Sequence, residues 1–243
     1  MSERLEGRNP ILEALKSGRT INKILIAKGE KHGSIREIIG LARSKGLLIQ
    51  EVDRKKLDTL AESGSHQGVM AFVAPKAYVQ VEDILENAKE REEPPFLVLL
   101  DGVEDPHNLG SILRSADGAG VHGVIIPQRR AVGLTAIVGK TSAGAMEYLP
   151  VARINNMAQT IDNLKEQGLW VVGADMDGQD YYYQANLTGP IALVIGGEGK
   201  GIGRLVKEKC DFLVRIPMKG QVSSLNAAVA GSLLMYEVAR QRG

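Results

Sequence analysis

The sequence has little of the chemistry that cross-links a protein or anchors it. A single cysteine, Cys210, excludes an internal disulfide, and the four scattered histidines show no metal-ligand spacing. No apolar run approaches the roughly 18 residues of a membrane-spanning helix, and the first ten residues are too polar for a signal peptide. We therefore expect a cytoplasmic protein with no disulfide, no metal and no membrane contact.

Net charge is also scarce, at +1, but it is unevenly distributed along the chain. Residues 1–76 carry 14 Lys and Arg against 9 Asp and Glu, whereas residues 77–95 carry 2 against 6. A mildly basic first segment suits an RNA-contacting module, although many solvated surfaces have a similar balance. Charge alone favours a nucleic-acid partner only slightly.

What the sequence does contain is enough apolar residues for two α/β domains. With 243 residues and 44% hydrophobic content it can bury substantial cores. Helical and strand patterns alternate over 1–76, with strands expected at 21–27, 47–52 and 68–74 and helices at 9–16, 34–46 and 54–62. Residues 77–95 are acidic, end in two prolines and predict a partly helical linker.

From residue 96 to 243, short apolar runs alternate with amphipathic stretches. The runs lie at 96–103, 123–127, 170–176, 191–197 and 211–217. This alternation predicts a buried parallel sheet covered by helices, in which ligands bind beyond the carboxyl ends of the strands. The loops after these runs are the places to look for chemistry.

Two glycine clusters have different meanings. GAGVHG, Gly118 to Gly123, fits the dinucleotide pattern G-x-G-x-x-G, but it lies between a helical stretch and a strand. The pattern requires the reverse order, so we interpret these glycines as the end of a helix and discount a dehydrogenase. IGGEGKGIG, residues 195–203, follows a strand and lacks the phosphate-loop spacing; it allows close backbone approach to a ligand or a tight bend, with a flexible turn as the alternative.

Two polar stretches complete the set of candidates. In DPHNLGSILRSADGAG, a helix beginning near Pro106 places Asn108 in its first turn, and Arg114 could lie on roughly the same side, facing a phosphodiester or ribose. A helix cap and a solvated arginine explain the pair equally well. In VSSLNAAVA, Ser223 or Ser224 could cap the last helix, whose C-terminal end carries Arg240 and Arg242.

Taken together, three segments in order resemble the SpoU-type (TrmH-like) RNA ribose 2′-O-methyltransferases of the SPOUT class. They are DPHNLGSILRSADGAG, LVIGGEGKGI continuing to FLVRIPM, and VSSLNAAVA. GRNPILEAL and HQGVMAFV also resemble the small RNA-binding domain of the bacterial subgroup that methylates a guanosine in 23S (large-subunit) ribosomal RNA. The resemblance covers essentially the whole chain.

The resemblance implies two domains and a cofactor. Residues 1–76 would form an α/β RNA substrate-binding domain of the L30e/L7Ae-like type, 77–95 a linker, and 96–243 a SPOUT α/β-knot domain, a deep trefoil knot with a parallel sheet. S-adenosyl-L-methionine would bind in the knot. A homodimer with the final helix at its interface is implied, and Val229, Leu233, Tyr236 and Val238 offer an apolar face for it, although packing within one chain would explain that face too.

The resemblance also assigns site residues, all of them present. The cofactor would contact Gly196, Gly197, Gly199, Ile216, Met218 and Leu225, and the reactive ribose would lie near Asn108, Arg114, Glu198, Ser224 and Asn226. Ser224 and Asn226 could then both start the last helix and line the site. Arginine is a poor proton acceptor, so we expect Arg114 to anchor a phosphate beside the target ribose. The alternatives are a related enzyme acting on transfer RNA or another ribosomal position and, less favoured, a non-catalytic RNA-binding protein.

Overall fold

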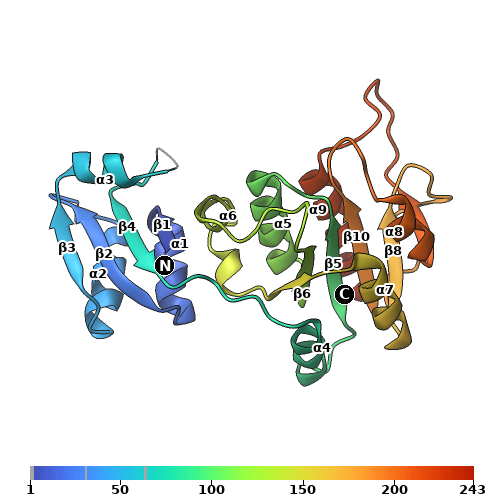
Figure 1. Cartoon of the computed structure of the whole chain (residues 1–243), viewed down its shortest axis with the longest axis horizontal. Coiled ribbons are helices and arrows are strands. Elements are labelled where there is room, and N and C mark those ends of the chain that lie inside the picture. The colour runs from blue at the N-terminus through green and yellow to red at the C-terminus, as the bar shows by residue number, and fades with distance from the viewer. Residues whose placement is uncertain (1–2, 31, 63–64) are drawn as a thin grey trace. The chain divides into compact units, whose positions relative to one another are not determined.

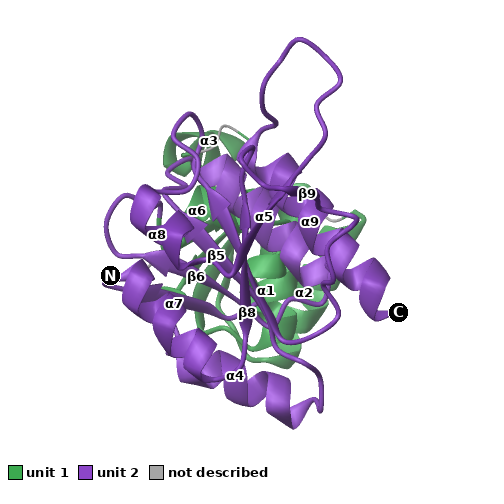
Figure 2. Cartoon of the chain, turned by 90° about the vertical axis from the view of Figure 1, so that its right-hand side faces the viewer, with its two compact units in different colours: residues 1–77, 133–148 green, residues 78–132, 149–243 purple. Residues whose placement is uncertain are grey.

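The computed structural model describes residues 3–30, 32–62 and 65–243, which form two compact units (Figures 1 and 2). Unit 1 comprises residues 1–77 and 133–148, and unit 2 comprises residues 78–132 and 149–243. No helix in the described part of the chain combines the length and the apolar character needed to cross a membrane.

Unit 1 is built on a four-stranded sheet with the order β1-β4-β2-β3. Its strands are β1 (Glu3–Glu6), β2 (Ile21–Ala27), β3 (Ile49–Val52) and β4 (Val69–Val73), and its helices are α1 (Arg8–Ser17), α2 (Ser34–Ser44), α3 (Arg54–Leu60) and α6 (Ala136–Thr141), with the 3-10 turn η1 (Ala145–Glu147). Ile24 and Ile26 pack in one core with α1 and α2, whereas Leu25 and Ala27 pack in a second core with Leu57 of α3. Burial on both faces explains why β2 is almost continuously apolar.

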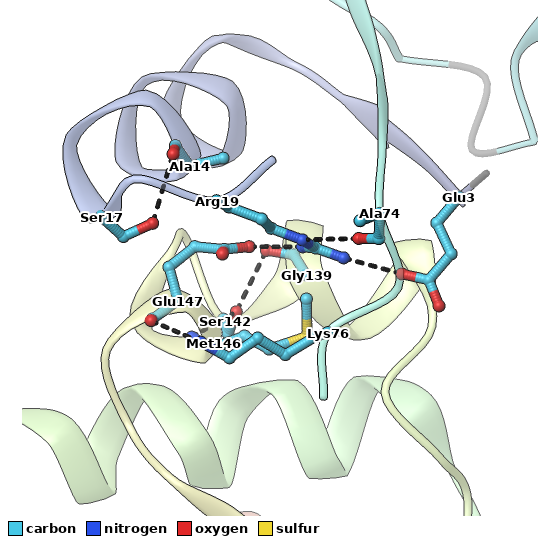
Figure 3. Close-up of polar contacts among 10 residues, drawn as sticks. All are labelled: Glu3, Ala14, Ser17, Arg19, Ala74, Lys76, Gly139, Ser142, Met146 and Glu147. Atoms are coloured by element: carbon cyan, nitrogen blue, oxygen red, sulfur yellow. Dashed lines mark hydrogen bonds and ion pairs between the residues drawn. The ribbon is translucent and has the colours of Figure 1, made fainter. Parts of the chain in front are cut away.

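Residues 133–148 join unit 1 through a buried charged cluster (Figure 3). The Arg19 guanidinium lies 2.6 Å from a carboxylate oxygen of Glu147 and 2.8 Å from one of Glu3. The side chains of Arg19 and Glu147 are only 6% and 2% exposed. Lys76 donates to the Glu147 carbonyl oxygen, and its burial lowers the pKa of its ammonium group. The sequence-based division left these residues in the second domain, because nothing in their pattern signals a long-range ion pair.

Unit 2 contains a seven-stranded sheet with the order β7-β6-β5-β10-β8-β11-β9, and its recorded pairings are all parallel. The strands are β5 (Phe96–Asp101), β6 (Gly123–Pro127), β7 (Val151–Ile154), β8 (Trp170–Ala174), β9 (Asp180–Tyr181), β10 (Ile191–Gly196) and β11 (Phe212–Arg215). The expectation of a buried parallel sheet is confirmed. The short strands β1, β7 and β9 were not anticipated, because two to four residues are too few to show a period.

The helices of unit 2 form two groups. α4 (Val81–Glu90), α7 (Met157–Glu166) and α8 (Arg204–Lys209) contribute to one hydrophobic core with the strands. α5 (Pro106–Gly118) and α9 (Ala227–Arg242) pack against each other, and a Cβ on Gly231 of α9 would lie 2.7 Å from Ile195 of β10. α4 confirms the helix expected in the linker. α5 ends at Gly118 and β6 begins at Gly123, so the helix-to-strand interpretation of the first glycine cluster is also confirmed.

Candidate active site

A pocket of about 400 Å³ opens at the carboxyl ends of β8, β10 and β11. Its volume lies in the range of small-molecule sites, and its place at the strand ends is the usual one in a parallel α/β sheet. The lining comes from the segment after β8, the glycine loop after β10, the segment after β11 and the start of α9. Three separate parts of the chain, residues 174–177, 195–201 and 214–230, therefore form a single cavity in unit 2.

The glycine loop is a closed turn held by backbone hydrogen bonds, a geometry that suits the expected tight bend and close approach to a ligand. Gly197 pairs with Gly201, and Gly199 and Gly201 have φ values of 79° and 63°. A Cβ on Gly197 would lie 2.0 Å from the carbonyl oxygen of Gly102, so only glycine fits there. Asp101 holds both ends of the loop: its carbonyl oxygen accepts from the Gly197 N–H and its carboxylate from the Gly203 N–H.

The N-terminus of α9 is capped by Asn226, and the expectation that Ser223 or Ser224 caps it is wrong. Asn226 Oδ1 accepts from the Ala228 N–H at 2.9 Å and the Val229 N–H at 3.3 Å. The helix therefore starts two or three residues later than expected. Asparagine is as good a cap as serine, because its side-chain oxygen accepts hydrogen bonds from the free N–H groups of the first turn. Ser223 and Ser224 instead line the pocket.

Asn226 also joins the glycine loop to α5. Its Nδ2 donates to Asn108 Oδ1 at 2.9 Å and to Glu198 Oε1 at 2.5 Å. Asn108 lies in the first turn of α5, as expected, where the Asp105 carboxylate caps the helix by accepting from the His107 and Asn108 N–H groups. Three of the five predicted catalytic residues therefore meet in one hydrogen-bonded cluster beside the pocket.

Arg114 lies on a different face of α5 from Asn108. Asn108 is 9% exposed, whereas Arg114 is an exposed residue, and no contact joins it to the other four predicted catalytic residues, all of which are described. The expectation that the two share roughly one side fails because six residues at about 100° each place them about 120° apart. Arg114 is therefore accessible to a large ligand approaching from solvent.

Comparison with known proteins assigns the family. The SpoU rRNA methylase model matches residues 95–236, and the model of the RNA 2′-O ribose methyltransferase substrate-binding domain matches residues 4–79. The chain belongs to the SpoU/TrmH family of RNA 2′-O-methyltransferases. It is 52% identical to a Bacillus subtilis protein assigned to the TrmH family of tRNA/rRNA methyltransferases, over 97% of this chain and 94% of that protein.

Solved structures of SpoU/TrmH proteins have the same fold. AviRb of Streptomyces viridochromogenes, a SpoU methyltransferase determined with S-adenosylmethionine, has a TM-score of 0.84 and 29% identity over 99% of this chain and 90% of its own. An S-adenosylmethionine-bound rRNA methyltransferase of Sinorhizobium meliloti has a TM-score of 0.80 and 27% identity, over 98% and 87%. The SPOUT fold, the RNA substrate-binding domain and the cofactor S-adenosylmethionine are thereby established for this SpoU/TrmH chain.

The residues that line the pocket of this SpoU/TrmH chain suit S-adenosylmethionine, which has both apolar and charged parts. A Cβ on Gly199 would meet no atom within 4 Å, so a ligand can approach the backbone there. Ile216, Met218 and Leu225 supply apolar surface, and two carboxylates, Asp175 and Asp177, supply negative charge for a cationic ligand. All six residues predicted to bind the cofactor line this pocket: Gly196, Gly197, Gly199, Ile216, Met218 and Leu225.

The segment after β8 also contributes to the pocket, although none of its residues was among the predicted site residues. Asp175, Met176 and Asp177 line the pocket, and Lys207 of α8 lies 2.8 Å from Asp175 and 2.9 Å from Asp177. The hydrogen bond from Lys207 lowers the pKa of the Asp177 carboxyl, and the two carboxylates raise the pKa of Lys207. The sequence did contain a signal for these two acids, since both follow the apolar run WVVGA at a strand end.

In the described ranges, no group of three or more His, Cys, Asp or Glu could hold a metal ion.

Proposed function

We propose that this protein methylates the ribose 2′-oxygen of a guanosine in 23S ribosomal RNA and does so in the cytoplasm. The observation that carries the proposal is the pocket itself, whose glycine loop and apolar residues adjoin the Asn108–Asn226–Glu198 cluster. The RNA substrate-binding match over residues 4–79 supports an RNA large enough to engage both units. Transfer RNA is the second candidate, because the relatives' names mention both tRNA and rRNA.

The residues of the chain orient the two reactants. S-adenosylmethionine supplies a methyl carbon to the 2′-oxygen, the C–S electron pair returns to sulfur to give neutral S-adenosylhomocysteine, and the hydroxyl proton leaves to water. The glycine loop, Ile216 and Leu225 hold the cofactor, and the cluster around Asn226 lies at the side from which the ribose approaches. Holding two reactants in line can contribute roughly 7–11 kcal/mol to lowering a barrier.

Arg114 is proposed to bind the phosphate beside the target ribose. Its exposure on α5 leaves the guanidinium free to form two parallel hydrogen bonds to phosphate oxygens. An arginine that remains protonated is unsuited to take the hydroxyl proton. Its contribution is therefore to RNA affinity and register.

The functional unit is proposed to be a homodimer formed through α9. Val229, Leu233 and Tyr236 are 49%, 39% and 53% exposed along this helix, an arrangement that suits coverage by a second copy. Val238 does not belong to this face, since it is fully buried within its own chain. Sedimentation of the native protein and of a Leu233→Glu variant tests the assignment: a dimer that becomes monomeric supports it, and a native monomer contradicts it.

Labelled-methyl transfer tests the reaction and the substrate together. The purified protein is incubated with S-adenosylmethionine and either a 23S rRNA transcript or bulk transfer RNA, and products are mapped by nuclease digestion and mass spectrometry. A 2′-O-methylguanosine at one position of the rRNA is the expected result. Methylation of transfer RNA alone would retain the mechanism and overturn the substrate, and methylation of neither would overturn the proposal for free RNA.

A further inference from the structure

The side-chain amide of Asn226 has only one possible orientation. Two backbone N–H groups, those of Ala228 and Val229, point at one of its terminal atoms at 2.9 and 3.3 Å. An N–H donor requires an acceptor, so the atom at that position must be Oδ1. The helix terminus thereby fixes Nδ2 on the opposite branch, where an isolated amide could otherwise be turned either way.

Both hydrogens of the Asn226 amino group are then in use. One is donated to Asn108 Oδ1 at 2.9 Å and the other to Glu198 Oε1 at 2.5 Å. An amide carries two donor hydrogens, so this group has no further hydrogen for a ligand. Asn226 therefore acts on a bound nucleotide only through its neighbours.

The same reasoning then fixes Asn108. Its Oδ1 must face Asn226, because it accepts a hydrogen bond there, and its own amino group is therefore on the other branch. Among the described residues no acceptor is recorded for that amino group, although Asn108 is only 9% exposed. That nitrogen is not among the fully buried side-chain atoms that lack a partner, so it is open to solvent and to a bound ligand. The free donor lies one hydrogen bond from Asn226, whose two chain neighbours, Leu225 and Ala227, line the cofactor pocket.

We infer that Asn226 is a positioning residue that turns the Asn108 amino group toward the bound RNA, where it donates a hydrogen bond to a ribose or phosphate oxygen of the target nucleotide. Glu198 is the second anchor of Asn226 and acts as a hydrogen-bond acceptor. The chain of three residues converts the cap of α9 into a fixed donor at the reaction site. The inference rests on the proposed function and assigns separate roles within it.

Asn226→Asp tests the inference directly, because it removes the side-chain N–H donor of residue 226 and keeps the oxygen that caps α9. A carboxylate still accepts from the Ala228 and Val229 N–H groups, and aspartate is as good a cap as asparagine. It can no longer donate to Asn108, which is then expected to rotate and present its oxygen to the RNA. We expect kcat to fall about 100-fold and the thermal midpoint to fall as well, because the new carboxylate faces Glu198. In a Glu198→Gln background this repulsion is absent, so the midpoint and the Kd for S-adenosylmethionine should stay close to those of Glu198→Gln alone while kcat remains low.

Asn163→Asp on the exposed face of α7 is the matched control for the added charge, since it should leave kcat unchanged. Asn108→Asp should lose as much activity as Asn226→Asp, and the double variant should lose no more than the worse single variant, because the two residues act as one unit. A native kcat for Asn226→Asp, or losses that multiply in the double variant, would overturn the inference.

Glu198→Gln separates an anchor from a proton acceptor. Glutamine keeps an oxygen that accepts from Asn226, so we expect kcat to fall about tenfold or less, with the shape of the pH profile retained. A loss of 1,000-fold or more, together with loss of the alkaline-rising limb of the profile, would assign the proton to Glu198 and contradict the anchoring role. Glu166→Gln, on α7, controls for removal of an exposed carboxylate.

A readout that needs no activity keeps this inference distinct from the proposed reaction. In protein labelled with ¹⁵N-asparagine, the Asn226 side-chain hydrogens should exchange slowly, and the Asn108 resonances should shift in Asn226→Asp and not in Asn163→Asp. Rapidly exchanging Asn226 hydrogens would sink the inference even if the native protein methylates RNA. Slow exchange in a protein that methylates neither RNA would retain the oriented amides and reject the reaction.

Discussion

Two side-chain clusters, one in each unit, bring together residues that are far apart in sequence, and they do so by opposite chemistry. In unit 1, Arg19 and Glu147 form a nearly fully buried ion pair across 128 positions. In unit 2, Asn108 and Asn226 form a neutral amide pair across 118 positions, next to an open pocket. The charged cluster holds a segment in place but leaves Glu147 Oε2 fully buried without a hydrogen-bond partner, whereas the unused donor of the amide cluster, on Asn108, is not a fully buried atom and lies beside an open pocket. Access to a ligand, rather than unused hydrogen-bonding capacity alone, distinguishes the amide cluster from the charged one.

The largest effect should come from breaking the charged cluster. Arg19→Met leaves Glu147 buried without its guanidinium partner, and we expect the free energy of unfolding to fall by about 3–5 kcal/mol. Urea denaturation followed by circular dichroism measures the loss. Replacing both residues, with Arg19→Met and Glu147→Leu, should recover part of the stability, because the fully buried ion pair is then gone and the partly buried Lys76 can still donate to the carbonyl oxygen of residue 147. An equal or larger loss in the double variant would contradict this account.

Distorting the glycine loop should weaken the binding of S-adenosylmethionine, whereas loss of the Arg19–Glu147 ion pair should mainly lower stability. In Gly197→Ala the new methyl group would lie 2.0 Å from the Gly102 carbonyl oxygen, so the loop must move. We expect the Kd for S-adenosylmethionine, measured by calorimetry, to rise at least about 100-fold, roughly 2.7 kcal/mol. Gly189→Ala is the control, since its Cβ would meet nothing within 4 Å. Native affinity in Gly197→Ala would show that the loop does not hold the ligand.

Arg114 is a predicted site residue that lies outside the amide cluster, so its replacement should affect RNA binding rather than the chemical step. Arg114→Lys retains the charge and loses the bidentate geometry, so we expect RNA affinity to fall about tenfold with a near-normal maximal rate. Filter binding and saturation kinetics with the methylated RNA separate the two quantities. Lost turnover on fully bound RNA would instead place Arg114 in the chemical step.

The smallest expected effect is on the pH dependence of stability, and it comes from His122, which is hydrogen-bonded to Phe96. Its Nδ1 accepts from the Phe96 N–H, and burial lowers the pKa of the imidazole. The unfolded chain then binds more protons than the folded one, so stability should decrease as pH falls through about 6.5, the usual value. Thermal midpoints at pH 7.5 and 5.5 should differ more in the native protein than in His122→Gln. An equal difference would remove His122 as a source of the pH dependence.

Much of the architecture could be predicted from the sequence, because it follows local periodicity. Apolar runs at 96–103, 123–127, 170–176, 191–197 and 211–217 predicted strands of a buried parallel sheet, and the helix-to-strand order of GAGVHG excluded a dinucleotide site. The ordered motifs also identified the family. The trefoil knot stays a prediction from that family, since no local pattern specifies how a chain threads.

The roles within the site could be predicted only in part. Resemblance selected Asn108, Glu198 and Asn226, but it could not say that Asn226 rather than a serine caps α9, that both of its amide hydrogens are already donated, or that Arg114 lies on another face of α5. The acids after β8 were missed although they follow a predicted strand end.

Short-range order in the sequence was enough to predict the longer strands, several helices and the family of the chain, whereas strands of two to four residues such as β1, β7 and β9 escaped it. The pairing of Arg19 with Glu147, and the hydrogen bonds by which Asn226 of α9 joins the glycine loop to α5, became known only from the folded structure. These are contacts between residues more than 25 positions apart, and their geometry depends on how whole elements pack. A hydrogen bond is directional, so the free donor on Asn108 becomes identifiable only when every neighbouring group has its place.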